Sequence, residues 1–93
     1  MKKFDFTKMH GLGNDFVIID ERDMKVNLSR TEIISVTNSH TGIGCDQLIT
    51  ICINSESHIV IRFFNSDGEE VSASGNGSRC VARMLMEDYN ACL

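Results

Sequence analysis

The chain has 93 residues, of which 42% are hydrophobic and 24% are charged, and it carries a formal net charge of −4. This length supports one small domain with a single core, and the acidic balance argues against a surface that follows nucleic-acid phosphates. The amino terminus has no apolar targeting segment and no apolar run approaches the length of a membrane span, so we expect a cytoplasmic protein.

The first half of the chain predicts two strands and a helix. Residues 4–8 alternate between apolar and polar positions, as in a half-buried strand, and residues 16–20 (FVIID) form a second, more apolar strand after a turn. Ser29 followed three residues later by Glu32 is a capping-box pattern, so we expect a helix that runs from there to about Asn38.

The second half predicts a strand pair and a second helix. Residues 48–53 and 59–64 are rich in β-branched side chains and are typical of two strands joined by a loop, with a turn at residues 65–68. A short strand over residues 71–73 precedes a helix at 78–89 that is apolar on most sides. We therefore expect an α+β domain, in which a mixed or antiparallel sheet wraps around this buried helix and the other helix lies outside.

A glycine-rich segment stands directly ahead of the second helix. Ser74 is followed by Gly75, Asn76 and Gly77. Glycines let the backbone approach a ligand, and the first N–H groups of a helix have no partner inside it, so such a segment suits a carboxylate. A tight turn between strand and helix would need the same glycines, and the segment alone does not separate the two readings.

Four motifs between residues 8 and 83 resemble those of the diaminopimelate epimerase family in order and spacing: KMHGLGNDF, GIGCDQL, RFFNSDGEEV and GNGSRCVAR. Members of this family are cofactor-independent isomerases of two similar domains that face each other across a cleft. The resemblance implies that residues 1–93 are the N-terminal domain, with the second domain absent. It also implies a fold that is half of the family's, no cofactor, and interconversion of LL- and meso-diaminopimelate in lysine and cell-wall biosynthesis.

The resemblance also assigns the residues that bind the substrate. Asn14, Gln47 and Asn65 match family positions that hydrogen-bond its amino and carboxylate ends. Gly75 and Asn76 match the pair whose backbone N–H groups meet its carboxylate. On the residues alone, Asn14 and Asn65 read instead as turn residues that bond their own backbone.

Ser74 occupies the position of the family's first catalytic cysteine, one of two that flank the substrate's α-carbon and exchange its proton. A serine hydroxyl ionises roughly seven pH units above a thiol, a gap worth about 10 kcal/mol. We therefore expect the chain to be inactive or severely impaired, and Cys80 lies too far into the helix to take over. A non-catalytic ligand-binding or interaction fragment, or a related cofactor-independent racemase, are the alternative readings.

The remaining polar residues predict supporting roles. Asp15 and Asp46 adjoin two of the assigned positions and are expected to brace their loops. The four cysteines have no C-x-x-C spacing and the three histidines no metal-ligand pattern, so we expect reduced thiols and no metal site. Half of a two-domain cleft leaves apolar surface uncovered, so we expect self-association or a homodimer. The expected ligand is a small-molecule amino-acid substrate, and we expect no nucleic-acid or membrane partner.

Overall fold

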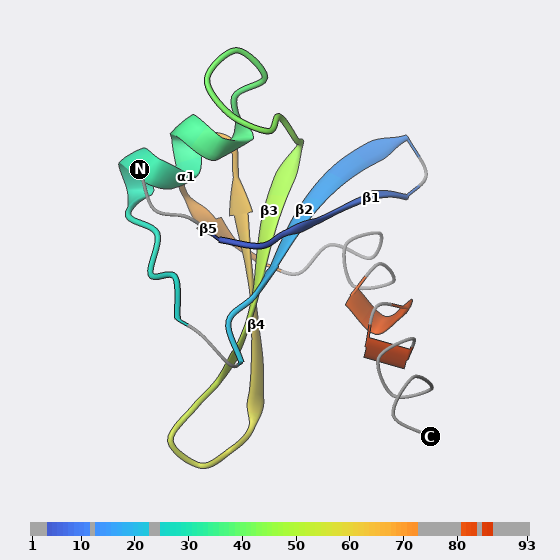
Figure 1. The fold of residues 1–93 in the computed structure, drawn as a ribbon, viewed down its shortest axis with the longest axis vertical. Coiled ribbons are helices and arrows are strands. Elements are labelled where there is room, and N and C mark those ends of the chain that lie inside the picture. Colours follow the sequence, from blue (N-terminus) through green and yellow to red (C-terminus); the bar gives the residue numbers. More distant parts are fainter. Residues whose placement is uncertain (1–3, 12, 23–24, 73–80, 84, 87–93) are drawn as a thin grey trace.

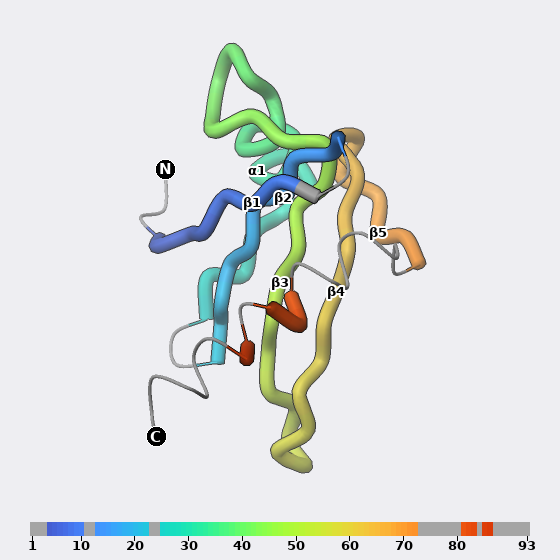
Figure 2. The backbone as a smooth tube through the Cα atoms, turned by 90° about the vertical axis from the view of Figure 1, so that its right-hand side faces the viewer, coloured from blue at the N-terminus to red at the C-terminus, as the bar shows by residue number. Residues whose placement is uncertain are grey.

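The computed structural model describes residues 4–11, 13–22, 25–72, 81–83 and 85–86. In this part the chain forms a five-stranded sheet with the strand order β1-β2-β3-β4-β5. The strands are β1 Thr7–Gly11, β2 Asn14–Asp20, β3 Gln47–Ile53, β4 Ile59–Asn65 and β5 Glu70–Val71, and helix α1 spans Arg30–Thr37. Figure 1 shows α1 on one side of the sheet and the helical residues 81–83 and 85–86 on the other. In Figure 2 the latter lie in front of the sheet and α1 lies behind it.

The sheet is mixed. β2 and β3 run parallel, and the other neighbouring strands pair in antiparallel fashion. Parallel neighbours need a crossover connection, and here that connection contains α1. The predicted strand pair of the second half is confirmed and forms an antiparallel hairpin, because β3 and β4 pair from Gln47 opposite Asn65 to Ile53 opposite Ile59. The predicted α+β class is also confirmed.

The first strand begins later than the sequence predicts. Phe4 and Phe6 precede β1, and their rings meet edge to face with centroids 6.4 Å apart. Phe4 packs against the core on the α1 side, while Phe6 remains 45% exposed. The pairing of β1 with β2 is set by the turn at Gly13, which has a φ of +87° that favours glycine. This turn aligns Thr7 to Gly11, rather than the two phenylalanines, with β2.

Helix α1 starts at the predicted capping box. The Ser29 hydroxyl accepts a hydrogen bond of 3.2 Å from the Glu32 N–H, and the Glu32 carboxylate accepts one of 2.9 Å from the Ser29 N–H. These two bonds satisfy N–H groups that have no partner within the helix. The helix ends at Thr37, with Asn38 as its C-cap, as predicted.

Each face of the sheet has its own apolar cluster. On the α1 side, Val17, Ile19 and Leu48 pack with residues of the helix and with Phe64. The other cluster contains six buried residues: Phe16, Ile18, Ile49, Ile51, Phe63 and Val81. Val81 is 1% exposed, so the second helical segment covers this face. That the sheet wraps around this segment, as the sequence predicts, stays a prediction. Of the helices in the described residues, none is long and apolar enough to cross a membrane.

Candidate functional site

Three of the predicted binding residues lie at one end of the sheet. Asn14 opens β2, Gln47 opens β3 and Asn65 closes β4. Because β2 and β3 are parallel and β4 is antiparallel to β3, the start of β2, the start of β3 and the end of β4 meet at the same edge. This is the upper end of the sheet in Figure 1.

The three amides also share one face. Residues two apart on a strand point to the same side of the sheet. Phe16, Ile49 and Phe63 each lie two positions from one of the amides, and all three pack in the cluster that contains Val81. Asn14, Gln47 and Asn65 therefore lie on the side of the sheet that carries the helical residues 81–83 and 85–86, away from α1. We call this set the amide site.

Two members of the amide site are in direct contact. The Gln47 Nε2 donates a hydrogen bond of 3.2 Å to the Asn65 Oδ1, and both side chains are half-buried. Amide side chains carry donors and acceptors together, which suits an ammonium and a carboxylate on one small molecule. The mutual bond orients Gln47 and Asn65 relative to each other on neighbouring strands, while Asn14 is exposed.

The end of α1 holds the loop that leads into Gln47. The N–H groups of Ile43 and Gly44 each donate to the Val36 carbonyl at 3.0 Å, and the Cys45 N–H donates to the Thr37 carbonyl at 3.0 Å. The last carbonyls of a helix have no partner inside it, so the returning loop satisfies them. The helix therefore fixes where β3 begins.

The turn after β4 holds Asn65. The Asn65 N–H donates to the Glu69 carbonyl at 3.0 Å, its carbonyl accepts from Gly68 N–H at 2.9 Å, and Gly68 has a φ of +82°. The backbone of Asn65 thus makes the turn that the residues alone predict. Its side chain, however, accepts from Gln47, so the residue serves the turn and the amide site together.

Asp15 and Asp46 brace the start of β2 and β3 against each other, as predicted for loop-supporting residues. The Asp15 N–H donates to the Asp46 carboxylate at 2.8 Å, and the Asp46 N–H donates to the Asp15 carbonyl at 3.0 Å. The Asp15 carboxylate also pairs with the His10 ring. The sequence predicts bracing at each position, but the mutual contact needs the parallel pairing of the two strands.

The remaining assigned residues, Ser74, Gly75 and Asn76, lie outside the described residues, as does Cys80. Of the described cysteines, Cys45 and Cys52 are free thiols. Burial raises the pKa of Cys45 to about 11, and burial likewise raises the pKa of Cys52. Cys45 packs on the α1 side and Cys52 lies toward the far end of β3, so neither thiol supplies a base at the amide site.

Histidine, cysteine and acidic side chains in the described residues form no group of three or more that could hold a metal ion.

Comparison with known proteins gives consistent matches. A family model described as diaminopimelate epimerase matches residues 6–92. Curated proteins named diaminopimelate epimerase match from Pelagibacter ubique at 52% identity over 87% of this chain and 29% of the relative, and from Sphingopyxis alaskensis at 48% identity over 86% and 30%. A third, from Zymomonas mobilis, is 44% identical over 91% of this chain and 32% of the relative. The chain thus spans about a third of the length of the curated relatives it matches.

Proposed function

The chain belongs to the diaminopimelate epimerase family, and from this premise we propose that it supplies the N-terminal wall of a cleft that binds diaminopimelate. The complete enzyme would be a cofactor-independent isomerase that interconverts the LL and meso forms. One observation supports the proposal most strongly. Asn14, Gln47 and Asn65 come from three different strands, yet they share one face and one end of the sheet.

The chemistry of the amide site fits an amino acid. A zwitterion needs donors for its carboxylate and acceptors for its ammonium group, and uncharged amides offer both. In the proposal, the backbone N–H groups of Gly75 and Asn76 complete the carboxylate site at the start of the second helix. Val81, which follows Gly75 and Asn76 in the sequence, packs on the face that carries the amides, and this placement supports the assignment of those two residues.

The reaction proposed for the family is a proton exchange with two bases. One residue removes the α-proton on one face of the substrate, and a second residue delivers a proton on the opposite face. Ser74 stands where the family has the first of these residues, a cysteine. The gap of about 10 kcal/mol between ionising a hydroxyl and ionising a thiol makes Ser74 a very poor base for this step.

The presence of Ser74 favours a second candidate function for this chain, which is ligand binding without turnover. The amide site does not depend on the residue at position 74, so it would retain its ligand even where proton exchange fails. A related cofactor-independent racemase with another amino-acid substrate would use the same site. Binding and turnover assays with several amino acids separate these candidates.

Solvent-deuterium incorporation at the α-carbon of diaminopimelate tests the proposal. The chain is joined to the remainder of the Sphingopyxis alaskensis relative, once with Ser74 and once with Ser74→Cys. We expect incorporation at the background rate with Ser74 and a rate at least 1,000-fold higher, on the order of what a catalytic nucleophile or base contributes, with the cysteine. Background incorporation in both folded chimaeras would refute the epimerase assignment.

We also propose that the isolated chain self-associates in the cytoplasm through the far end of the sheet. Ile53, Ile59 and Ile61 are 43%, 50% and 37% exposed, and they lie on the face of the amide site. Exposed neighbouring isoleucines favour burial against a second copy. Sedimentation velocity should show a dimer or larger species at high concentration that Ile59→Lys weakens. A monomer across the whole concentration range would contradict this expectation.

A further inference from the structure

The start of β2 and the start of β3 are joined by a side chain rather than by the regular ladder alone. The register of β2 and β3 places Asp15 opposite Asp46, so in a regular parallel ladder the Asp15 N–H would donate to the backbone carbonyl of Cys45. The Cys45 N–H is bonded to the Thr37 carbonyl of α1 and Gly44 before it has a φ of +81°, so the chain has left the strand direction there. The Asp46 carboxylate accepts the Asp15 N–H instead, at 2.8 Å.

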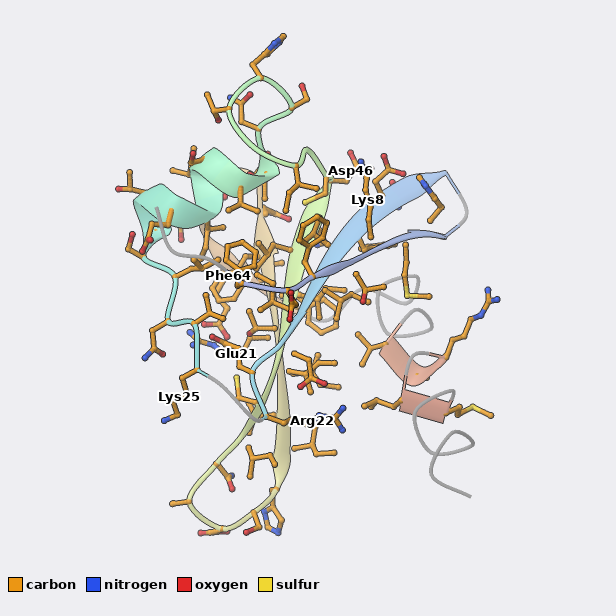
Figure 3. All side chains as sticks on the ribbon, viewed as in Figure 1. Lys8, Glu21, Arg22, Lys25, Asp46 and Phe64 are labelled. Carbon is orange, nitrogen blue, oxygen red and sulfur yellow. The ribbon has the colours of Figure 1, made fainter. Side chains whose placement is uncertain are left out.

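This contact closes a ring of two hydrogen bonds between the strands. The Asp46 N–H donates to the Asp15 carbonyl at 3.0 Å, and the Asp46 side chain accepts from the Asp15 N–H. Figure 3 places Asp46 at the upper end of the sheet, where Lys8 also lies, and these two residues border the same hollow on the α1 side. The ring therefore lies behind the amide site, on the opposite face.

Each residue of the ring has a member of the amide site as its neighbour in the chain. Asn14 precedes Asp15, and Gln47 follows Asp46. Because successive side chains on a strand point to opposite faces, fixing Asp15 and Asp46 from behind fixes the positions of Asn14 and Gln47 in front. A slip of one residue between the strands would turn one of the two amides toward α1 and away from the other.

We propose that Asp46 is a positioning residue of the substrate site: its carboxylate holds the start of β2 against β3 so that Asn14 and Gln47 present their amides to one ligand. This role rests on the proposed function, because it concerns the same site. The carboxylate touches the backbone of Asp15 and not the ligand. Substitution should therefore alter the placement of both amides together.

The test uses the whole 93-residue chain, labelled with ¹⁵N, and three variants. Asp46→Ala removes the acceptor, whereas Asp46→Asn keeps an acceptor oxygen without its charge. Asn54→Ala is the matched control, because the Asn54 side chain accepts from the Glu56 and His58 N–H groups at the far end of β3. Hydrogen exchange of the Asp15 amide, side-chain amide shifts of Asn14 and Gln47, and affinity for meso-diaminopimelate are measured for each.

We expect Asp46→Ala to speed exchange of the Asp15 amide about 10-fold, to shift the amide resonances of Asn14 and Gln47, and to weaken meso-diaminopimelate binding about 3- to 10-fold. Asp46→Asn should restore most of the affinity, with exchange about 3-fold faster than in the parent chain. Asn54→Ala should leave all three readings at the site unchanged. If Asp46→Ala does not fold, the exchange rate in Asp46→Asn decides the question.

Two outcomes would overturn the proposal. One is an Asp15 amide that exchanges at the parent rate in the Asp46 variants, and the other is a set of Asn14 and Gln47 shifts no larger than those in Asn54→Ala. The proposed function fails in a different way, because a parent chain that binds no diaminopimelate would refute it. The exchange rates and amide shifts need no ligand, so they still decide the role of Asp46 in that case.

Discussion

Replacement of Gly42 by alanine tests how firmly the end of α1 fixes the start of β3. A Cβ atom at Gly42 would lie 2.4 Å from the Ser35 carbonyl oxygen and 2.8 Å from the Val36 Cα, both of which belong to the helix backbone. Ordinary contact needs about 3.5 Å, so the loop would have to retreat by roughly 1 Å. The bonds from Ile43 and Gly44 to the Val36 carbonyl would then stretch or break.

Each of these two bonds is worth about 1 kcal/mol, so we expect Gly42→Ala to lower the free energy of unfolding by about 2–3 kcal/mol. A domain of this size would lose about 10–20 °C in Tm. Gly13→Ala is the matched control. Gly13 has a φ of +87°, but a Cβ there meets nothing within 4 Å, so only the backbone strain of about 1 kcal/mol remains.

Urea unfolding followed by circular dichroism measures both variants against the parent chain. Amide exchange of residues 43–45 should accelerate in Gly42→Ala and stay unchanged in Gly13→Ala. If Gly42→Ala is no less stable than Gly13→Ala, close packing of the loop against α1 does not fix the start of β3.

Three further predictions follow from single contacts. Ser29→Ala removes one half of the capping box and should lower the free energy of unfolding by about 1 kcal/mol in the same urea assay, whereas an unchanged midpoint would contradict it. The Arg22 side chain donates to the Asp20 carboxylate and lowers the pKa of Asp20. The ionised carboxylate therefore adds stability at pH values above its ordinary pKa near 4, and this stability is lost as the pH falls through the pKa of the folded state. Arg22→Gln should flatten the loss of stability below about pH 4, and superimposable acid limbs would count against the pair. Burial raises the pKa of Cys45 to about 11. Iodoacetamide should therefore label this thiol at pH 8 on the order of 100-fold more slowly in the native chain than in urea, as measured by mass spectrometry. Equal labelling rates would rule out burial of Cys45 as a neutral thiol.

Local signals in the sequence predict local structure well in this chain. The capping box depends on Ser29 and Glu32, which are neighbours on one turn, and the turn after β4 depends on a glycine with positive φ. The hairpin of β3 and β4 joins two segments that follow each other directly. In each case the residues that form the contact are close in the chain, so pattern and propensity suffice.

The parallel pairing of β2 and β3 is not evident from such signals. Residues 16–19 are all buried, and a continuous apolar run of this kind fits a strand covered on both faces. It does not identify the partner strand, because β3 begins after a helix and a loop. The mutual contact of Asp15 and Asp46 depends on that pairing, so their individual bracing roles were predictable and their partnership was not.

The amide site likewise has one part that the sequence predicts and one part that depends on strand pairing. On the residues alone, Asn14 and Asn65 are typical turn residues, and only the family resemblance assigns them to a ligand. The structure adds that both lie with Gln47 on one face, because the positions fall in the same alternation along three paired strands. The three residues share a face and an end of the sheet because of the register of the whole sheet, and no single motif predicts that register.

Titration of the ¹⁵N-labelled chain with meso-diaminopimelate measures most directly whether the amide site binds this ligand. We predict saturable shifts of the side-chain amide resonances of Asn14, Gln47 and Asn65, together with those of the backbone amides of Gly75 and Asn76, and no comparable shifts at residues 53–59. Absence of saturable shifts, or shifts confined to residues remote from this end of the sheet, would contradict the proposed site.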